Sequence, residues 1–467
     1  MANAMQALEP IWRSVGLPAQ ALQHLTLTGG EPALPSSFAV GTAAQTTLAA
    51  AALAATEIGW RRNGLRQQLR VDMRHAALEC CGHFTINGRV PPQWDKLAGL
   101  YPCGAGGAGG WVRLHTNFAH HRDGLLRLLG LPVGTATPCD AVATGLQGWR
   151  ACDFEDTAAD AGLVVAALRS FEQWDRHPQS AAVASRPLVD IEKIGEAAPL
   201  ALPALPRDAR PLHGVRVLDL TRILAGPVGT RTLAGYGADV LLVNAPHLPN
   251  IEAIIDTSRG KHTALADLRE PAGRDGLRAM LRDAHVFVQS YRPGALAGLG
   301  FGANELASTR PGIVVVSLSA YGDTGPWAGR RGFDSLVQTA TGLNHAEAQA
   351  AGSSQPRALP MQILDMASGF LMAFGAQAAL LRQQAEGGSW QVRVSLARTA
   401  LWLRKLGRVQ NGYAAPPPDF AGLMETQPSG YGELSAVRHA AEFSHTPACW
   451  VRPSMPPGSD PLAWPAD

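Results

Sequence analysis

Positive charges follow several apolar runs in the second half of the sequence. Arg222, Arg259, Lys261 and Arg292 each stand at or just after the expected end of a strand. Ligands of open α/β sheets bind in the crevice at the carboxyl ends of the strands, and arginine forms paired, charge-assisted hydrogen bonds with phosphate. These positions predict a site for a phosphorylated small molecule. For each side chain taken alone, a solvated loop charge is the simpler interpretation.

The glycines of the familiar phosphate-binding motifs are missing from this region. The turn "LTRILAGPVGT" has no G-x-G-x-x-G, and Asn244 closes the second apolar run where dinucleotide-binding proteins carry an acidic residue. Backbone N–H groups after Gly226 and Pro227, at the expected start of a helix, are able to face an anion. The sequence therefore disfavours a dehydrogenase. It is consistent with an anionic ligand other than a dinucleotide at this turn.

Residues that commonly bind metals are present without metal-binding spacing. His115, His120 and His121 cluster in "HTNFAHH", but no carboxylate is spaced to complete a site, which favours structural histidines. None of the six cysteines forms a C-x-x-C pair. We expect no metal site, free thiols and a cytoplasmic location.

Charge and hydropathy exclude two further classes. Forty basic and 38 acidic residues nearly balance, which argues against a nucleic-acid-binding protein. The N-terminus lacks the pattern of a signal peptide. The run from Thr42 to Trp60 is rich in alanine and threonine, and we expect a packed helix there rather than a membrane span.

Alternating apolar strands and helices carry the charged positions. Continuous apolar strands separated by helices are typical of a parallel sheet that is covered on both faces. We expect strands at Val215–Leu220, Val240–Val243, Val286–Gln289, 313–321 and 390–396, and helices at Val228–Tyr236, Arg274–Asp283 and 366–384.

The first half of the chain contains a second copy of one of these units. The stretch 38–79 and the stretch 366–403 both read as an Ala-rich helix, a glycine turn, a strand with alternating R-V and a further helix. Prolines in "EAAPLALPALPRDARPLHG" indicate a linker between the halves. The predicted division is a repeat segment at 1–100, a small α+β domain at 101–195, the linker at 196–212, a parallel-sheet α/β domain at 213–406 and a closing segment at 407–467.

Several ordered motifs resemble family III CoA-transferases of the CaiB–BaiF type. The similarity runs from about Leu212 to Leu406, through the segments "GVRVLDLTRILAGPVGTRTLAGYGADVLLV", "SRGKHTALADLREPAGRDGL", "AHVFVQSYRPGALAGLGFG", "RPGIVVVSLSAYGDTGPWAGRRGFDSLVQTATG" and "GGSWQVRVSLARTAL". The resemblance implies a Rossmann-like, open parallel-sheet large domain with a smaller α+β domain, in a chain that is a rearranged fusion of family segments. It also implies a homodimer.

The same resemblance implies a ligand and the residues that contact it. The ligand is coenzyme A, bound as an acyl-CoA substrate without a metal. Its nucleotide is expected at Arg222, Ile223 and Ala225, at Arg259 and Lys261, and at Ser290, Tyr291 and Arg292.

The carboxylate nucleophile of these transferases has two candidates here. An aspartate that attacks the thioester is expected about nine residues after Gly342, where this chain has Ala351; Glu347 is the nearest substitute, with a surface loop acid as the alternative. Asp365 matches an aspartate of the related α-methylacyl-CoA racemases. Phe333 stands where the racemases have their histidine, so racemisation is disfavoured, and a helix N-cap is the other role for Asp365.

We therefore expect an enzyme that moves CoA between an acyl-CoA donor and a carboxylic acid acceptor. The alternatives are an acyl-CoA isomerase or lyase of the same superfamily and a non-catalytic CoA-binding homologue. The expected partners are small acyl-CoA and carboxylic acid molecules, without nucleic acid or membrane.

Overall fold

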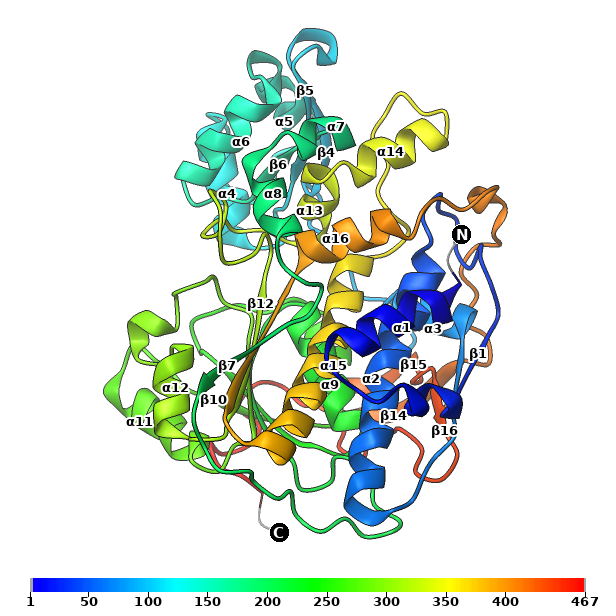
Figure 1. The fold of residues 1–467 in the computed structure, drawn as a ribbon. Coiled ribbons are helices and arrows are strands. Elements are labelled where there is room, and N and C mark those ends of the chain that lie inside the picture. Colours follow the sequence, from blue (N-terminus) through cyan, green and yellow to red (C-terminus); the bar gives the residue numbers. More distant parts are fainter. Residues whose placement is uncertain (1–2, 466–467) are drawn as a thin grey trace.

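A computed structural model describes residues 3–465 and divides them into a large α/β body and a smaller domain (Figure 1). The body is built on a seven-stranded sheet in the order β10-β9-β8-β11-β12-β13-β7. Six of these strands are parallel, and β7 pairs antiparallel with β13. The strands are β7 (Asp190–Gly195), β8 (Arg216–Leu220), β9 (Asp239–Asn244), β10 (Lys261–Leu265), β11 (Val286–Gln289), β12 (Val314–Ser319) and β13 (Ser389–Ser395).

Both faces of this sheet are buried, as the continuous apolar runs predict. Val217, Val286 and Val314 belong to one core, while Leu218 and Phe287 face a second core on the other side. Side chains alternate between the faces of a strand, so a strand that is apolar at every position needs cover on both. The helices that follow these strands are α9 (Ala225–Gly235), α10 (Ile254–Thr257), α11 (Pro271–Leu281), α12 (Ala303–Thr309), α15 (Ile363–Glu386) and α16 (Leu396–Lys405).

Helix α2 (Val40–Asn63) lies along α15, and the two form the centre of the body (Figure 1). Each has 24 residues, ends at a glycine and is followed by a strand and a further helix. This common order agrees with the internal repeat read from the sequence. The companions of α2 are α1 (Ala4–Ser14), β1 (Leu25–Thr28), β2 (Leu69–Asp72) and α3 (Met73–Glu79).

Helix α15 is also long and apolar enough to cross a membrane, but its most apolar stretch is wholly buried in the protein. Two glycines allow α9 to lie close against it. A Cβ atom on Gly229 would approach the Gly369 carbonyl oxygen to 2.8 Å, and one on Gly369 would approach the Ala225 carbonyl oxygen to 2.5 Å. Only glycine lets the two helix backbones come this near.

The smaller domain packs helices against an antiparallel sheet of β4, β5 and β6. The glycine cluster Gly104–Gly110 connects β4 to β5, as a loop that includes one short 3₁₀ turn. The elements are β4 (Gly99–Cys103), β5 (Gly110–Leu114), β6 (Val165–Ala167), α4 (Ala119–Leu128), α5 (Cys139–Gly145), α6 (Ala151–Asp160), α7 (Phe171–Asp175) and α8 (Pro178–Ala184).

The sequence-based division differs from the structure at two places. β7 lies within the predicted small domain but forms the edge of the large sheet, because it pairs with β13. Helices α13 (Asp334–Ala340) and α14 (Leu343–Ala350) come from the second half and lie with the smaller domain (Figure 1). Both differences arise from long-range pairing, which local patterns do not record.

The C-terminal segment returns to the first half of the chain. β16 (Ala441–Phe443) pairs with β2, and β15 (Gly432–Val437) lies between β14 (Met424–Ser429) and β3 (Phe84–Ile86). No helix or strand is assigned between Gly195 and Arg216, where the proline-rich linker is predicted.

Candidate functional site

A cavity of about 340 Å³ lies where the order of the sheet strands reverses. β8 has β9 on one side and β11 on the other, so the loops after β8 and β11 separate at this point. Open α/β sheets bind ligands at such switch points. Arg222 and Ile223 line the cavity from the first loop, and Ser290, Tyr291 and Arg292 line it from the second. The family resemblance implies that these five residues contact one ligand, and the structure brings them together.

Four arginines make this space positive, and we call it the basic cavity. Arg330 and Arg331 line it together with Arg222 and Arg292. Arg330 approaches Asp156 at 3.5 Å and Glu155 at 3.9 Å, whereas among the described residues the other three have no carboxylate partner. Arg222 and Arg331 donate instead to the carbonyl oxygens of Pro249 and Gly162. The charge of Arg292 and burial both act to lower the pKa of Arg331, with burial the larger cause. Unpaired cations that repel one another provide a ready site for an anionic ligand.

The loop that carries Arg222 and Ile223 is held in a strained conformation. Ile223 has a φ of 79°, in the left-handed region that β-branched residues avoid. The Arg222 backbone N–H donates to Ser290 Oγ at 3.2 Å, which joins the loops after β8 and β11. The neighbouring Ala225 is the first residue of α9; it is buried and does not line the basic cavity.

Lys261 contacts the start of α9, which follows this loop, and does not line the basic cavity. Its ammonium group is fully buried and donates to Asp219 Oδ2 at 3.0 Å, to Thr230 Oγ1 at 2.7 Å and to the Pro227 carbonyl oxygen at 3.0 Å. Asp219 also accepts hydrogen bonds from the backbone N–H and the hydroxyl of Thr221. The charge of Lys261 is thus satisfied inside the protein, and it fixes the start of α9 against β10.

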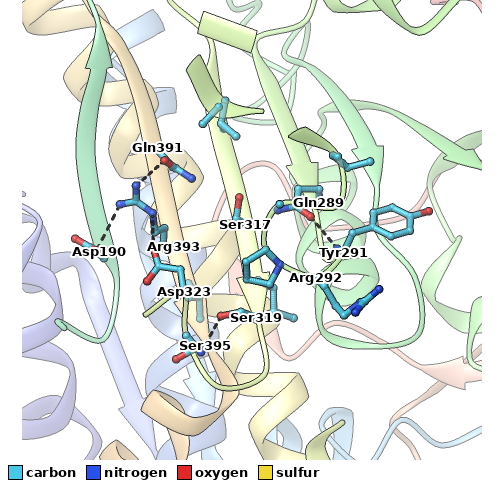
Figure 2. Close-up of a pocket in the computed structure, with 18 of the residues that line it drawn as sticks. Asp190, Gln289, Tyr291, Arg292, Ser317, Ser319, Asp323, Gln391, Arg393 and Ser395 are labelled. Carbon is cyan, nitrogen blue, oxygen red and sulfur yellow. Dashed lines mark hydrogen bonds and ion pairs between the residues drawn. The ribbon is translucent and has the colours of Figure 1, made fainter. Parts of the chain in front are cut away.

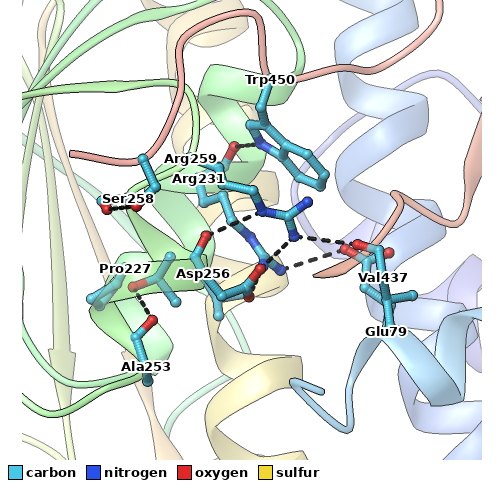
Figure 3. Close-up of polar contacts among 12 residues, drawn as sticks. Glu79, Pro227, Arg231, Ala253, Asp256, Ser258, Arg259, Val437 and Trp450 are labelled. Atoms are coloured by element: carbon cyan, nitrogen blue, oxygen red, sulfur yellow. Dashed lines mark hydrogen bonds and ion pairs between the residues drawn. The ribbon is translucent and has the colours of Figure 1, made fainter. Parts of the chain in front are cut away.

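Arg259 likewise lies in a buried ionic cluster, shown in Figure 3. Its guanidinium pairs with Asp256 at 2.5 Å and with Glu425 at 2.8 Å, and stacks over Trp450 at 3.9 Å. Arg231 joins the same cluster through Asp256 and through Glu79, 3.5 Å away. The structure therefore places Arg259 among carboxylates that connect α3, α10 and the C-terminal segment, and not on the basic cavity.

A second cavity, of about 350 Å³, adjoins the basic cavity and contains Asp365; we call it the Asp365 cavity. Ile223 and Phe333 line both spaces. Asp365 lies in the first turn of α15, where the helix dipole favours a negative charge. The helix cap is Gln362, without a side-chain hydrogen bond, so the interpretation of Asp365 as the N-cap is wrong.

Asp334 is the buried partner of Asp365. Its Oδ2 accepts the backbone N–H of Asp365 at 2.9 Å, and its Oδ1 accepts a hydrogen bond from Gln338. Burial raises the pKa of Asp334 to about 7. Burial and the charge of Asp334 together raise the pKa of Asp365 well above its ordinary value. Two carboxyl groups that interact this way lose their protons in separate steps.

Glu347, the other candidate nucleophile, is enclosed elsewhere. It lies on α14, where the family resemblance implies a loop, and its side chain is buried. Ser36 Oγ donates to its carboxylate at 2.5 Å, the Ser37 N–H donates at 3.0 Å, and the Tyr413 hydroxyl donates to it as well. Glu347 lines neither the basic cavity nor the Asp365 cavity, and Ala351 is the C-cap of the same helix.

The first half of the chain supplies one wall of the Asp365 cavity, which the sequence analysis did not predict. His115 stacks on Phe333 with ring centroids 4.0 Å apart, and its Nδ1 has no hydrogen-bond partner among the described residues. Burial is the main cause that lowers the pKa of His115 to about 3, so its imidazole is neutral at pH 7. His120 and His121 line the basic cavity instead. In the sequence, Arg330 and Arg331 are marked only as two adjacent arginines before "GFD", and they were not predicted as site residues.

A third cavity, of about 190 Å³, lies beyond the turn at 290–293, at the ends of β11, β12 and β13 (Figure 2). Arg393 is engaged there by Asp323 at 3.2 Å, by Asp190 at 3.6 Å and by Gln391 at 2.7 Å. Its charge is thereby balanced, unlike the charges in the basic cavity. Among the described residues we find no cluster of histidine, cysteine and acidic side chains that could hold a metal ion.

Comparisons with known proteins identify relatives of this chain. Residues 212–422 match CoA-transferase family III. An acyl-CoA transferase of Gibberella moniliformis is 29% identical over 368 residues, which cover 70% of this chain and 64% of the relative. Succinyl-CoA:glutarate CoA-transferase of Mus musculus is 33% identical over 192 residues, covering 38% of this chain and 43% of the relative.

A crystal structure of a hypothetical protein from Mycobacterium tuberculosis aligns with a TM-score of 0.40 and 31% identity, covering 43% of this chain and 58% of that one. The chain thus spans less than two thirds of the length of each of these proteins.

Proposed function

We propose that the protein, whose residues 212–422 match CoA-transferase family III, moves coenzyme A from an acyl-CoA donor to a carboxylic acid acceptor. One observation carries the proposal: Asp365 lines a cavity that adjoins a second cavity lined by four arginines, with Ile223 and Phe333 common to both. A charged nucleotide and a reacting thioester need two such compartments side by side.

The nucleotide of CoA fits the basic cavity. Its phosphates require several hydrogen-bond donors with net positive charge, which Arg222, Arg292 and Arg331 supply. Arg222 Nε is buried without a partner among the described residues, and a bound phosphate would satisfy it. The pantetheine arm would then pass Ile223 and Phe333 and present its thioester to Asp365.

Asp365 serves as the nucleophile in this proposal. Its carboxylate attacks the thioester carbonyl, a C–O bond forms as the C–S bond breaks, and CoA leaves as a thiolate. The thiolate attacks the aspartyl carbonyl of the resulting anhydride, which gives an aspartyl-CoA thioester and releases the donor acid. The acceptor carboxylate then attacks this thioester, and the returning thiolate takes the acceptor acyl group. Asp365 ends as a free carboxylate, and the cycle needs neither ATP nor a metal.

The geometry favours Asp365 over Glu347 for this role. A nucleophile has to meet the substrate carbonyl, and Asp365 lines a cavity with room for one. The Glu347 carboxylate is held by Ser36, Ser37 and Tyr413, which makes it a structural hydrogen-bond acceptor. Both residues entered the sequence analysis as candidates, and a chemical trap separates them.

Trapping of the aspartyl thioester tests the proposal. The protein is incubated with pentanoyl-CoA and then with hydroxylamine, and its peptides are analysed by mass spectrometry. We expect a hydroxamate on Asp365, no modification in Asp365→Asn, and unchanged labelling in Glu347→Gln. A hydroxamate on Glu347 would overturn the assignment. CoA binding with neither labelling nor exchange of labelled CoA between acids would identify a non-catalytic CoA-binding homologue. An altered acyl chain without exchange would identify an isomerase or lyase.

A further inference from the structure

The lining of the Asp365 cavity indicates which acyl groups the protein accepts. We infer that this cavity takes an uncharged, apolar acyl chain and excludes acyl chains that end in a second carboxylate. The inference rests on the proposed function, because it assigns the Asp365 cavity to the acyl group of a CoA thioester.

Apolar side chains supply most of the surface that an acyl chain would touch. They come from both halves of the chain and include three aromatic rings: Phe84, Trp94, Ile223, Ile251, Phe333 and Met366. Burying each methylene group of an acyl chain against such a surface stabilises the complex. An apolar chain therefore gains affinity with each carbon that enters the cavity.

A second carboxylate would find no cation in this space. Neither arginine nor lysine occurs among the described residues that line the cavity, whereas Asp95, Glu252 and Asp365 do. Arg113 contacts the Trp94 ring, with its guanidinium carbon 4.8 Å from the ring centroid, but does not line the cavity. A carboxylate that loses water without gaining a cation pays a large desolvation penalty. Asp95 is paired with Arg122 at 3.5 Å, so Glu252 and Asp365 are the acids that would add repulsion.

His115 does not compensate for the missing cation. Its side chain is 5% exposed and lines the cavity, and burial together with the charges of its surroundings lowers its pKa to about 3. A neutral imidazole offers one hydrogen bond from its unpartnered Nδ1, but no charge. This group suits a carbonyl or hydroxyl oxygen on an uncharged ligand.

The two classes of acyl group are distinguished with a matched pair of thioesters. Pentanoyl-CoA and glutaryl-CoA have acyl chains of equal carbon number and differ in the terminal group, a methyl in one and a carboxylate in the other. Calorimetric titration of the full-length protein gives their Kd values, with CoA itself as the reference. We expect pentanoyl-CoA to bind more tightly than glutaryl-CoA by about tenfold or more. Equal affinities, or tighter binding of glutaryl-CoA, would overturn the inference.

A variant that introduces a cation tests the same point in the opposite direction. Ile251 is half-buried at the cavity, so Ile251→Arg is tolerable for folding. Relative to CoA, we expect it to weaken the binding of pentanoyl-CoA and to strengthen the binding of glutaryl-CoA. Val451→Arg adds the same charge at a residue that is 77% exposed, and should leave all three constants unchanged. An unchanged ratio in Ile251→Arg would contradict the inference.

A second variant covers the case in which Ile251→Arg does not fold. Trp94 is 39% exposed and lines the cavity, so Trp94→Ala removes apolar surface without opening the core. We expect weaker binding of pentanoyl-CoA and unchanged binding of CoA, and unchanged binding of both would contradict the inference. If the wild-type protein binds no CoA at all, the proposed function fails, and that result is distinct from CoA binding without acyl preference.

Discussion

Asp334 Oδ2 accepts the backbone N–H of Asp365 at 2.9 Å, so one buried carboxyl group holds in place the helix turn that presents the other. This contact connects α13, which lies with the smaller domain, to the first turn of α15 in the body. The position of the proposed nucleophile therefore depends on how the smaller domain sits, and its ionisation depends on the charge of Asp334.

The charge of Asp334 predicts the response of activity to pH. Asp365 has to lose its proton to attack a thioester, and burial and Asp334 both raise its pKa. Activity should therefore fall as the pH drops, and the fall should begin at a higher pH than it would for an aspartate with an ordinary pKa. Asp334→Asn keeps the size and one acceptor oxygen but removes the charge, so the acid limb of kcat/KM should move to lower pH. Asp275→Asn, at an exposed acid, is the control. An acid limb that stays in place would contradict the role of Asp334.

Arg292 should contribute to CoA affinity through its charge. It lines the basic cavity and, among the described residues, has no carboxylate partner. We expect Arg292→Ala to weaken CoA binding by about tenfold and to make binding less sensitive to salt. Arg278→Ala removes an arginine that pairs with Asp275 on α11, and it should leave the Kd unchanged. Titrations at two salt concentrations measure both effects, and equal Kd values for the two variants would argue against a nucleotide in this cavity.

Glu347 should matter for stability and not for chemistry. Glu347→Gln replaces one acceptor oxygen by a donor where Ser36 and Tyr413 donate, so we expect a loss of about 1–3 kcal/mol in the free energy of unfolding. Urea unfolding measures this loss, with Glu386→Gln at the exposed end of α15 as the control. Lost transfer activity at unchanged stability would assign chemistry to Glu347 instead.

Gly369 should tolerate no side chain. A Cβ at this position would approach the Ala225 carbonyl oxygen to 2.5 Å and Val228 Cβ to 3.0 Å, so α9 and α15 would have to move apart. We expect Gly369→Ala to lower the free energy of unfolding by about 1–3 kcal/mol. Gly298→Ala adds a methyl group where no atom lies within 4 Å, and thermal unfolding of the two variants should separate them clearly. A Gly369→Ala variant as stable as Gly298→Ala would show that the helices have room to adjust.

The strands and helices of the large sheet could be predicted from sequence because their signals are local. The predicted strand Val286–Gln289 coincides with β11, and the predicted helix Arg274–Asp283 overlaps α11. The loops after β8 and β11 were placed correctly for the same reason, since a parallel sheet brings the ends of its strands to one edge.

Whether each charged side chain is paired inside the protein or lines a cavity could not be predicted from the same patterns. Arg259 and Lys261 follow the motif as well as Arg222 does, yet carboxylates distant in sequence, Glu425 and Asp219, pair with them inside the protein. Glu347 is captured by Ser36, which lies 311 residues away. Contacts over such separations are set by the packing of the two halves, and no local pattern of residues encodes them.

The proline-rich linker joins two parts, neither of which encloses Asp365 by itself. Trp94 and His115 come from one side of the linker, and Phe333 and Met366 come from the other. A fragment that begins at residue 212 would lose this wall together with α2, which packs along α15, and β7, which pairs with β13. Because the apolar α15 would then be exposed, we expect such a fragment not to fold alone. Cutting the chain at the linker should therefore abolish CoA binding and transfer together, unless the other fragment is supplied in trans.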